Sequence, residues 1–201
     1  SVLTLLAMPA LWPVLIMMFV AYAPSASLRG LWAGPYLRDV FGAGADVIGT
    51  VTLVMALAMI AGNFAYGPLD RVFGTRKWVI FGGNAIMFPA LALLALTAPA
   101  TITVTTILLA VIGLTGATFP MIVAHGRAFL PQHLIGRGVT LINLFGIGAA
   151  GIMQFTTGPM WRAAEARTES VAAPYAALFG FIALTVVIGL AVYLRAEDRT
   201  D

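Results

Sequence analysis

The chain has 201 residues, of which 61% are hydrophobic and only 9% charged, and its formal net charge is +3. With a mean hydropathy of +0.98, this composition excludes a water-soluble globular surface. The small, dispersed positive charge gives no reason to expect a nucleic-acid partner, and the lack of cysteine excludes disulfides and Cys-ligated metals. We expect neither a metal nor a cofactor.

Charged residues fall in a few short clusters, and the runs between them carry no charge: 1–28, 47–69, 78–124, 138–161 and 170–194. A helix of about 20 apolar residues crosses the hydrocarbon core of a membrane. Four runs fit one crossing each, and the longest fits two, with a break at residues 97–101. The strands of membrane β-barrels are shorter than these runs and alternate apolar with polar residues, whereas these runs are continuously apolar. We therefore predict a single all-α integral membrane domain over residues 1–201. The six helices are predicted at about 8–36, 46–69, 76–97, 101–125, 136–160 and 171–195.

Basic residues are unequally divided between the two sides of this predicted bundle. The side of the termini has seven: Arg71, Arg76, Lys77, Arg127, Arg137, Arg195 and Arg199. The other side has four: Arg29, Arg38, Arg162 and Arg167. The positive-inside rule then places both termini in the cytoplasm, and we expect a bacterial inner membrane. The charged tail, residues 195–201, is expected to be a solvated end.

The loop between the second and third predicted helices, residues 67–77, reads Gly-Pro-Leu-Asp-Arg-Val-Phe-Gly-Thr-Arg-Lys. It resembles the cytoplasmic loop motif of the major facilitator superfamily, roughly G-x-L-[AS]-D-R-x-G-R-[KR], which follows the second helix of each six-helix half. It departs from the motif by one extra residue before the second Gly and by Thr75 before the basic pair. Gly136-Arg137 resembles the Gly-Arg that opens the fifth helix of a half. The resemblance implies a gating loop made of Gly67, Asp70, Arg71, Gly74, Arg76, Lys77 and Arg137.

The resemblance covers the whole chain and implies a C-terminal six-helix half, built from two inverted three-helix repeats. Two predicted helices contain Gly and Pro interruptions: the first has Pro24, Gly30, Gly34 and Pro35, and the fourth has Gly113, Gly116 and Pro120. Interrupted helices at corresponding positions of two repeats point to a binding site. The resemblance likewise implies that these two helices line a central cavity.

A polar and aromatic stripe marks the first predicted helix, where Tyr22, Ser25, Arg29, Trp32 and Tyr36 follow at helical spacing. An arginine at membrane depth is costly and suggests a functional site. We therefore predict that Arg29 contacts an anionic or acceptor group of a substrate, with Tyr22, Trp32 and Tyr36 beside it. In the alternative reading, Arg29 reaches the headgroups, and the aromatic residues form an interfacial belt.

The fifth predicted helix adds two candidate substrate ligands, Asn143 and Gln154. They are eleven residues apart and share a helix face, which turns either to a polar cavity or to a neighbouring helix. His125 and His133 flank an inner loop and are interpreted as ordinary inner-surface residues. No carboxylate lies well inside a predicted helix, so a proton relay is not expected in this chain.

These patterns predict half of a secondary active transporter that moves a small organic solute by alternating access. Its partners would be membrane lipid, the small-molecule substrate, and either the N-terminal six-helix half of the same transporter or a second copy. The alternatives are a half-size transporter acting as a homodimer and a non-transporting membrane sensor or assembly module. An enzyme is not expected, because the chain contains neither H-E-x-x-H nor G-x-S-x-G.

Overall fold

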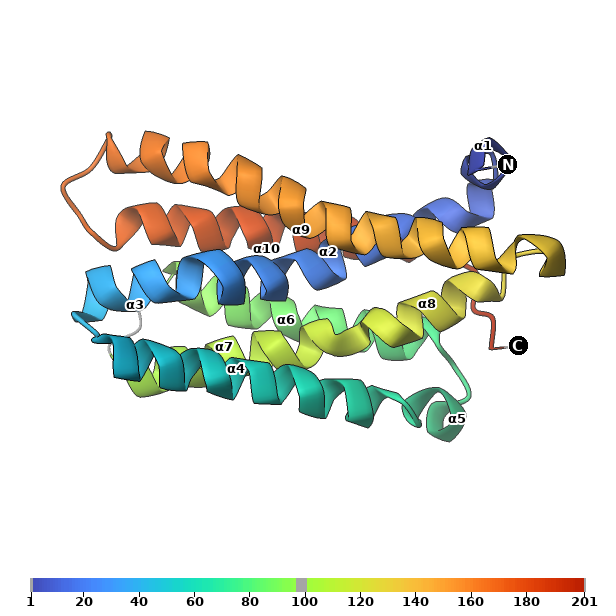
Figure 1. Ribbon diagram of the computed structural model, residues 1–201, viewed down its shortest axis with the longest axis horizontal. Coiled ribbons are helices and arrows are strands. Elements are labelled where there is room, and N and C mark those ends of the chain that lie inside the picture. The colour runs from blue at the N-terminus through green and yellow to red at the C-terminus, as the bar shows by residue number, and fades with distance from the viewer. Residues whose placement is uncertain (1, 97–100, 201) are drawn as a thin grey trace.

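The computed structural model describes residues 2–96 and 101–200, which form an elongated helical bundle and contain no strand (Figure 1). The α-helices are α1 (Val2–Leu6), α2 (Trp12–Ser27), α3 (Ala33–Phe41), α4 (Ala45–Tyr66), α5 (Leu69–Phe73), α6 (Lys77–Leu96), α7 (Ile102–Thr115), α8 (Phe119–Arg127), α9 (Ile135–Glu165) and α10 (Ala173–Tyr193). Short 3-10 helices occur at η1 (Pro9–Leu11), η3 (Gly116–Thr118) and η4 (Gln132–Leu134), and η2 (Leu28–Trp32) is a π-helical turn. Figure 1 places both ends of the chain at the end of the bundle that carries α5, which we call the α5 end.

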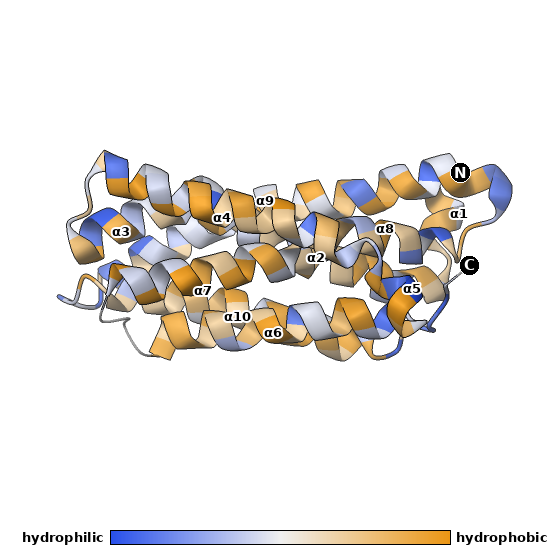
Figure 2. Ribbon diagram, turned by 90° about the horizontal axis from the view of Figure 1, so that it is seen from below, coloured by the Kyte–Doolittle hydropathy of each residue, from blue (hydrophilic) through white to orange (hydrophobic). Residues whose placement is uncertain are grey.

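Six helical segments of the described chain are long and apolar enough to cross a membrane, which confirms the predicted set of six. We call them spans 1 to 6: Pro9–Phe41, Ala45–Tyr66, Lys77–Leu96, Ile102–Arg127, Gln132–Glu165 and Ala173–Tyr193. Apolar residues run along the shafts and polar residues concentrate towards the two ends (Figure 2). This pattern indicates an integral membrane protein. The predicted break at residues 97–101 falls almost entirely outside the described residues.

Two spans are longer than predicted. Span 1 continues to Phe41, because the residue that ends it is Gly42, whose φ of 66° turns the chain away. Pro35 does not end the span, because it lies in the first turn of α3. Span 5 continues to Glu165 through much of the predicted outer loop, because the Ala-Ala-Glu sequence at its end favours a helix.

The six spans are arranged so that one broad face combines spans 1, 2, 4 and 5. Span 1 packs against spans 5 and 6, span 2 against span 4, and span 3 against spans 4 and 6. In the view of Figure 1, α6 and α10 lie behind, so the viewer looks at the face of spans 1, 2, 4 and 5, which we call the front face. Spans 2 and 4 approach closely at Gly62, where a Cβ would lie only 2.4 Å from the carbonyl oxygen of Leu114.

Candidate functional site

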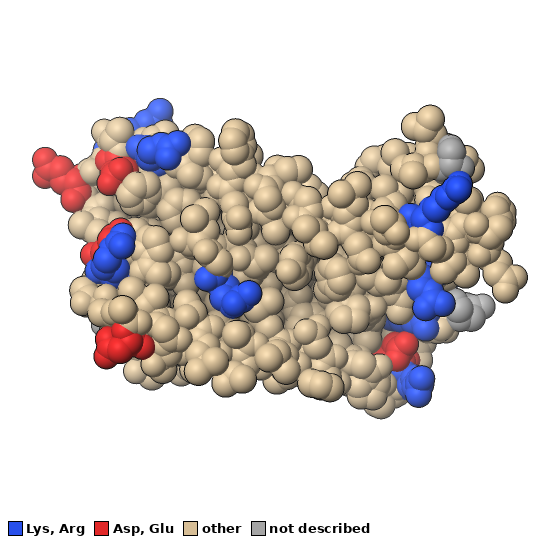
Figure 3. All heavy atoms as spheres, in the orientation of Figure 1, with Lys and Arg blue, Asp and Glu red and all other residues tan. Residues whose placement is uncertain are grey.

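The front face carries an isolated charge far from the ends of the bundle. Arg29 lies twelve residues before Phe41, the end of span 1, which is about 18 Å at 1.5 Å per residue. Every other Lys or Arg of the described spans lies within six residues of a span end. Figure 3 accordingly shows charges gathered at both ends and a single basic side chain standing alone on this face. Arg29 is exposed, and within residues 2–96 and 101–200 it has no ion pair or hydrogen bond.

The backbone around Arg29 is the π-helical turn η2. The N–H of Ala33 closes it by donating to the carbonyl of Leu28. Pro35 contributes to the irregularity, because it has no N–H to donate to the carbonyl of Leu31 four residues earlier. A π turn holds an extra residue, so it changes the direction of the side chains that follow it, and such turns are frequent at functional sites.

Span 5 packs directly against this turn. The Trp32 Nε1–H donates to Thr157 Oγ1 at 2.9 Å, which fixes the two helices side by side. Two residues before Trp32, Gly30 leaves room for a side chain from span 5, since a Cβ at this position would lie 3.5 Å from Gln154 Nε2. The structure therefore brings the predicted ligand Gln154 to the turn that carries Arg29.

The interruption in span 4 lies at a similar level. At η3, Ala117 leaves helical geometry with φ −78° and ψ 20°. Span 1 touches this point, because a Cβ on Gly116 would lie 2.8 Å from Ser25 Oγ, and Ser25 is one helical turn before Arg29. The helices that the sequence predicted to be interrupted are thus both irregular, and the irregular segment of span 4 contacts span 1 one helical turn before its π turn.

The predicted polar and aromatic stripe is divided between two environments. Tyr22 is half-buried, with its ring centre 5.3 Å from that of Phe119. Trp32 and Tyr36 are 7% and 3% exposed, whereas Arg29 is open. The rings that surround the buried pair belong to Phe41, Trp161, Tyr175 and Phe179. Contact of Trp32 and Tyr36 with a substrate stays a prediction, and in this conformation both pack against other rings.

Asn143, the other predicted ligand of span 5, is half-buried, and its Oδ1 is buried without a hydrogen-bond partner in the described part of the chain. Eleven residues of continuous helix separate it from Gln154, which is about 16 Å. The two amides therefore stand at different depths, and only Gln154 is placed at the π turn.

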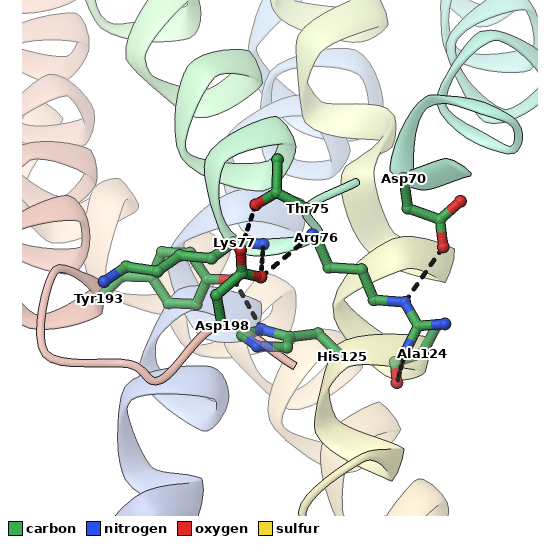
Figure 4. A network of polar contacts seen from close by, with 8 residues as sticks. All are labelled: Asp70, Thr75, Arg76, Lys77, Ala124, His125, Tyr193 and Asp198. Atoms are coloured by element: carbon green, nitrogen blue, oxygen red, sulfur yellow. Dashed lines mark hydrogen bonds and ion pairs between the residues drawn. The ribbon is translucent and has the colours of Figure 1, made fainter. Parts of the chain in front are cut away.

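At the α5 end, the predicted gating loop divides into paired and unpaired residues. The Arg76 Nε–H donates to Asp70 Oδ2 at 3.1 Å, and Arg76 Nη1 donates to the carbonyl of Ala124 at 3.5 Å (Figure 4). The first contact lies within the loop, and the second ties the loop to span 4 near its end. Arg71 and Arg137 are exposed, and neither has an ion pair among the described residues.

The remaining residues of the loop shape it and connect it to span 6. Gly67 caps the C-terminus of α4, and Gly74, with φ 66°, ends α5. Lys77 Nζ donates to the carbonyl of Leu194 at 2.8 Å, just beyond the end of span 6.

The charged tail is exposed at Arg195, Glu197 and Asp198, as expected of a solvated end, but it is also docked on the bundle. The carboxylate of Asp198 accepts hydrogen bonds from the Thr75 hydroxyl and from the backbone N–H groups of Arg76 (3.2 Å) and Lys77 (3.0 Å) (Figure 4). Because α6 begins at Lys77, Asp198 caps its N-terminus from the far end of the chain. Burial alone would raise the pKa of Asp198, but the hydrogen bonds from Thr75, Lys77 and Arg76 outweigh it and lower the pKa below its usual value.

The interpretation of His125 as an ordinary inner-surface residue is wrong, because its side chain is fully buried. Nε2 lies 2.9 Å from the carbonyl of Glu197, which can only accept, so in the neutral ring this nitrogen carries the hydrogen. Nδ1 then accepts from the Tyr193 hydroxyl at 2.7 Å. His125 and Tyr193 are 68 residues apart, so no local sequence signal could have indicated the pair.

Comparison with known proteins adds no family assignment. No protein-family model matches the chain, and no curated protein sequence matches it. The resemblance of residues 67–77 to the facilitator loop motif therefore stays a prediction.

Proposed function

We propose that this chain is one six-helix half of a secondary transporter of the major facilitator type, which moves a small organic solute across the membrane by alternating access. In this proposal, the front face forms one wall of a central cavity and a second bundle forms the other. The α5 end faces the cytoplasm of a bacterium, because it carries the larger set of basic residues.

The observation that carries the proposal is the position of Arg29, exposed and unpaired within the described residues, about 18 Å from the end of span 1. The hydrocarbon core is about 30 Å thick, so its midplane lies about 15 Å below either surface. A charged side chain at that depth costs about 2.5–3.5 kcal/mol even on the mildest scale, and such residues almost always face a bundle interior or a water-filled cavity. The front face is therefore better suited to line a cavity than to face lipid.

The arrangement of the interruptions supports transport over a static sensor or assembly module. The irregular segment of span 4 meets span 1 at Ser25, which lies one helical turn before Arg29 and the π turn. Transporters built from inverted repeats bind substrate near the midplane, where discontinuous helices meet. Spans 1 and 4 open the two proposed three-helix repeats, so their interruptions fall at corresponding positions.

The charge of Arg29 also bears on which bundle completes the cavity. A twofold dimer through the front face would set two unpaired Arg29 side chains opposite each other, and like charges repel strongly where the dielectric constant is low. We therefore favour a different six-helix bundle as the partner over a second copy.

The test is whether one position on the front face can be reached by water from both sides of the membrane. These 201 residues contain no cysteine, so Gly30→Cys would introduce their only thiol. A Cβ at residue 30 would make only ordinary contact with Gln154, and the variant should therefore fold. A membrane-impermeant thiol reagent is applied to right-side-out and to inside-out vesicles that contain the complete protein. Alternating access predicts labelling in both preparations.

The matched control is Leu184→Cys, at the middle of α10, whose side chain is 56% exposed on a helix behind the front face. We expect it to face lipid and to stay unlabelled from both sides. If Gly30→Cys is as unreactive as this control, the front face lines no cavity. If Gly30→Cys reacts from one side only, alternating access is refuted and a static module is favoured.

A further inference from the structure

We infer that the solute is an organic anion, and that its anionic group binds at the π turn, where Arg29 supplies the positive charge and Gln154 a neutral hydrogen-bond donor. This inference rests on the proposed function and names the chemical class of its substrate.

The first step is the charge balance of the front face. Each described Asp or Glu lies in a loop, in the tail or within a few residues of a span end, and along span 1 the nearest to Arg29 is Asp39. Ten residues of helix separate the two, about 15 Å, and Asp39 already accepts hydrogen bonds from Arg38 and from the Tyr175 hydroxyl. The described chain therefore supplies no counter-charge to Arg29. A charged side chain that is removed from bulk water requires a counter-charge. The chemistry therefore favours a ligand that carries a negative charge.

The second step is the set of groups at the turn. A guanidinium is permanently charged and presents several N–H donors in a plane, which matches the oxygens of a carboxylate, sulfonate or phosphate. Gln154 Nε2 lies against Gly30, next along the chain to Arg29. Two donors at the same turn suit a group that only accepts. A cationic solute would add a second positive charge, and a neutral solute would leave Arg29 uncompensated.

The third step is to separate a ligand anion from a carboxylate on the second bundle, which would also balance Arg29. A protein carboxylate would already have neutralised the site before any solute arrives, whereas a site that awaits an anionic solute keeps a positive potential. The two cases therefore differ in the electrostatic potential of the empty cavity.

The experiment measures that potential at the thiol of Gly30→Cys in membranes that contain the complete protein. Labelling rates are compared for a sulfonate-bearing and a trimethylammonium-bearing methanethiosulfonate, with Arg29 intact and with Arg29→Gln. Each ratio is divided by the ratio that the same two reagents give with a small thiol in solution, which removes their different intrinsic reactivities and leaves the potential at residue 30. Arg38→Gln is the matched control, because it removes a charge from the same helix about 12 Å away, beyond the Debye length of about 10 Å at 0.1 M salt.

For a unit charge about 8 Å from the thiol in water, Coulomb's law changes each rate about 2.4-fold in opposite directions. We therefore expect Arg29→Gln to lower the ratio of sulfonate to ammonium labelling by about fivefold or more, and Arg38→Gln to leave it unchanged. If Gly30→Cys disturbs the fold, Leu31→Cys provides a second position at the same turn, because Leu31 is 41% exposed.

The possible outcomes distinguish a failure of the anion site from a failure of the proposed transport function. Labelling by both reagents with a ratio that Arg29→Gln does not change would refute the anion site and leave the cavity in place. Absence of labelling by either reagent, at both Gly30→Cys and Leu31→Cys, would refute the proposed function itself. A normalised ratio above unity with Arg29 intact, which falls to about unity for Arg29→Gln alone, supports both. A normalised ratio near unity with Arg29 intact, which falls below unity for Arg29→Gln, would assign the counter-charge to a carboxylate of the second bundle and refute the anion site.

Discussion

The contact between spans 2 and 4 can be tested by adding a single methyl group. In Gly62→Ala, the new Cβ would lie 2.4 Å from the carbonyl oxygen of Leu114 and 2.6 Å from the Cβ of Ala117. Carbon and oxygen normally approach no closer than about 3.3 Å, so the two helices must separate by about 1 Å. Neither neighbour can rotate away, because both atoms are fixed by the backbone. Overpacking of this kind costs about 1–3 kcal/mol.

The matched control is Gly49→Ala on the same helix, where a Cβ would meet nothing within 4 Å. Replacing this helical glycine should stabilise the protein by about 0.5–1 kcal/mol. Thermal unfolding in mild detergent, followed by tryptophan fluorescence, measures both variants. For a chain of this size, each kcal/mol corresponds to about 2–4 °C, so Gly62→Ala should lower Tm by about 2–12 °C. Equal melting of the two variants would refute the close approach of spans 2 and 4 at the interruption.

Two further predictions concern the α5 end. Asp198→Ala removes the carboxylate that accepts from the backbone N–H groups of Arg76 and Lys77 and should cost about 0.5–1 kcal/mol at neutral pH. Because the folded pKa of Asp198 lies below its ordinary value of 3.8, this stabilisation is present above 3.8 and is lost as the pH falls through the folded value. The difference in Tm from the parent should therefore shrink on acidification, and a difference that is constant with pH would contradict the cap. His125→Ala leaves the Tyr193 hydroxyl and a backbone carbonyl unpaired and should cost about 1–3 kcal/mol, whereas the exposed His133→Ala should cost almost nothing. Equal Tm values for the two histidine variants would show that the buried network does not stabilise the fold.

Much of the fold could be predicted because its signals are local in the sequence. A charge-free run of about 20 residues indicates a helix at membrane depth whatever it packs against, so the six spans follow from composition. The interruptions could be located for the same reason, since Gly and Pro act on the backbone within a turn of their own position. The ends of spans 1 and 5 were predicted several residues too early, because span 1 continues to its cap at Gly42 and span 5 continues through the Ala-Ala-Glu sequence to Glu165.

Contacts between distant residues could not be predicted, because they depend on which helices become neighbours. Asp198 was assigned to a solvated tail, since nothing in the tail shows that the free N–H groups at the start of α6 lie within its reach. The pairing of His125 with Tyr193 is hidden for the same reason. Within the candidate site, helical spacing placed Arg29 and Trp32 on one stripe, but the π turn and the packing of span 5 bury Trp32 and leave Arg29 open.

The sequence by itself therefore determined that this chain is a bundle of six apolar helices with an arginine far from any loop, because hydrophobicity and backbone preference belong to each segment alone. Only the tertiary structure decided that Arg29 stands unpaired among the described residues, at a π turn whose Gly30 lies against Gln154 and which follows the contact of Ser25 with the interruption of span 4. That arrangement requires three helices to pack at one level, and packing depends on the shapes of all the surfaces that meet.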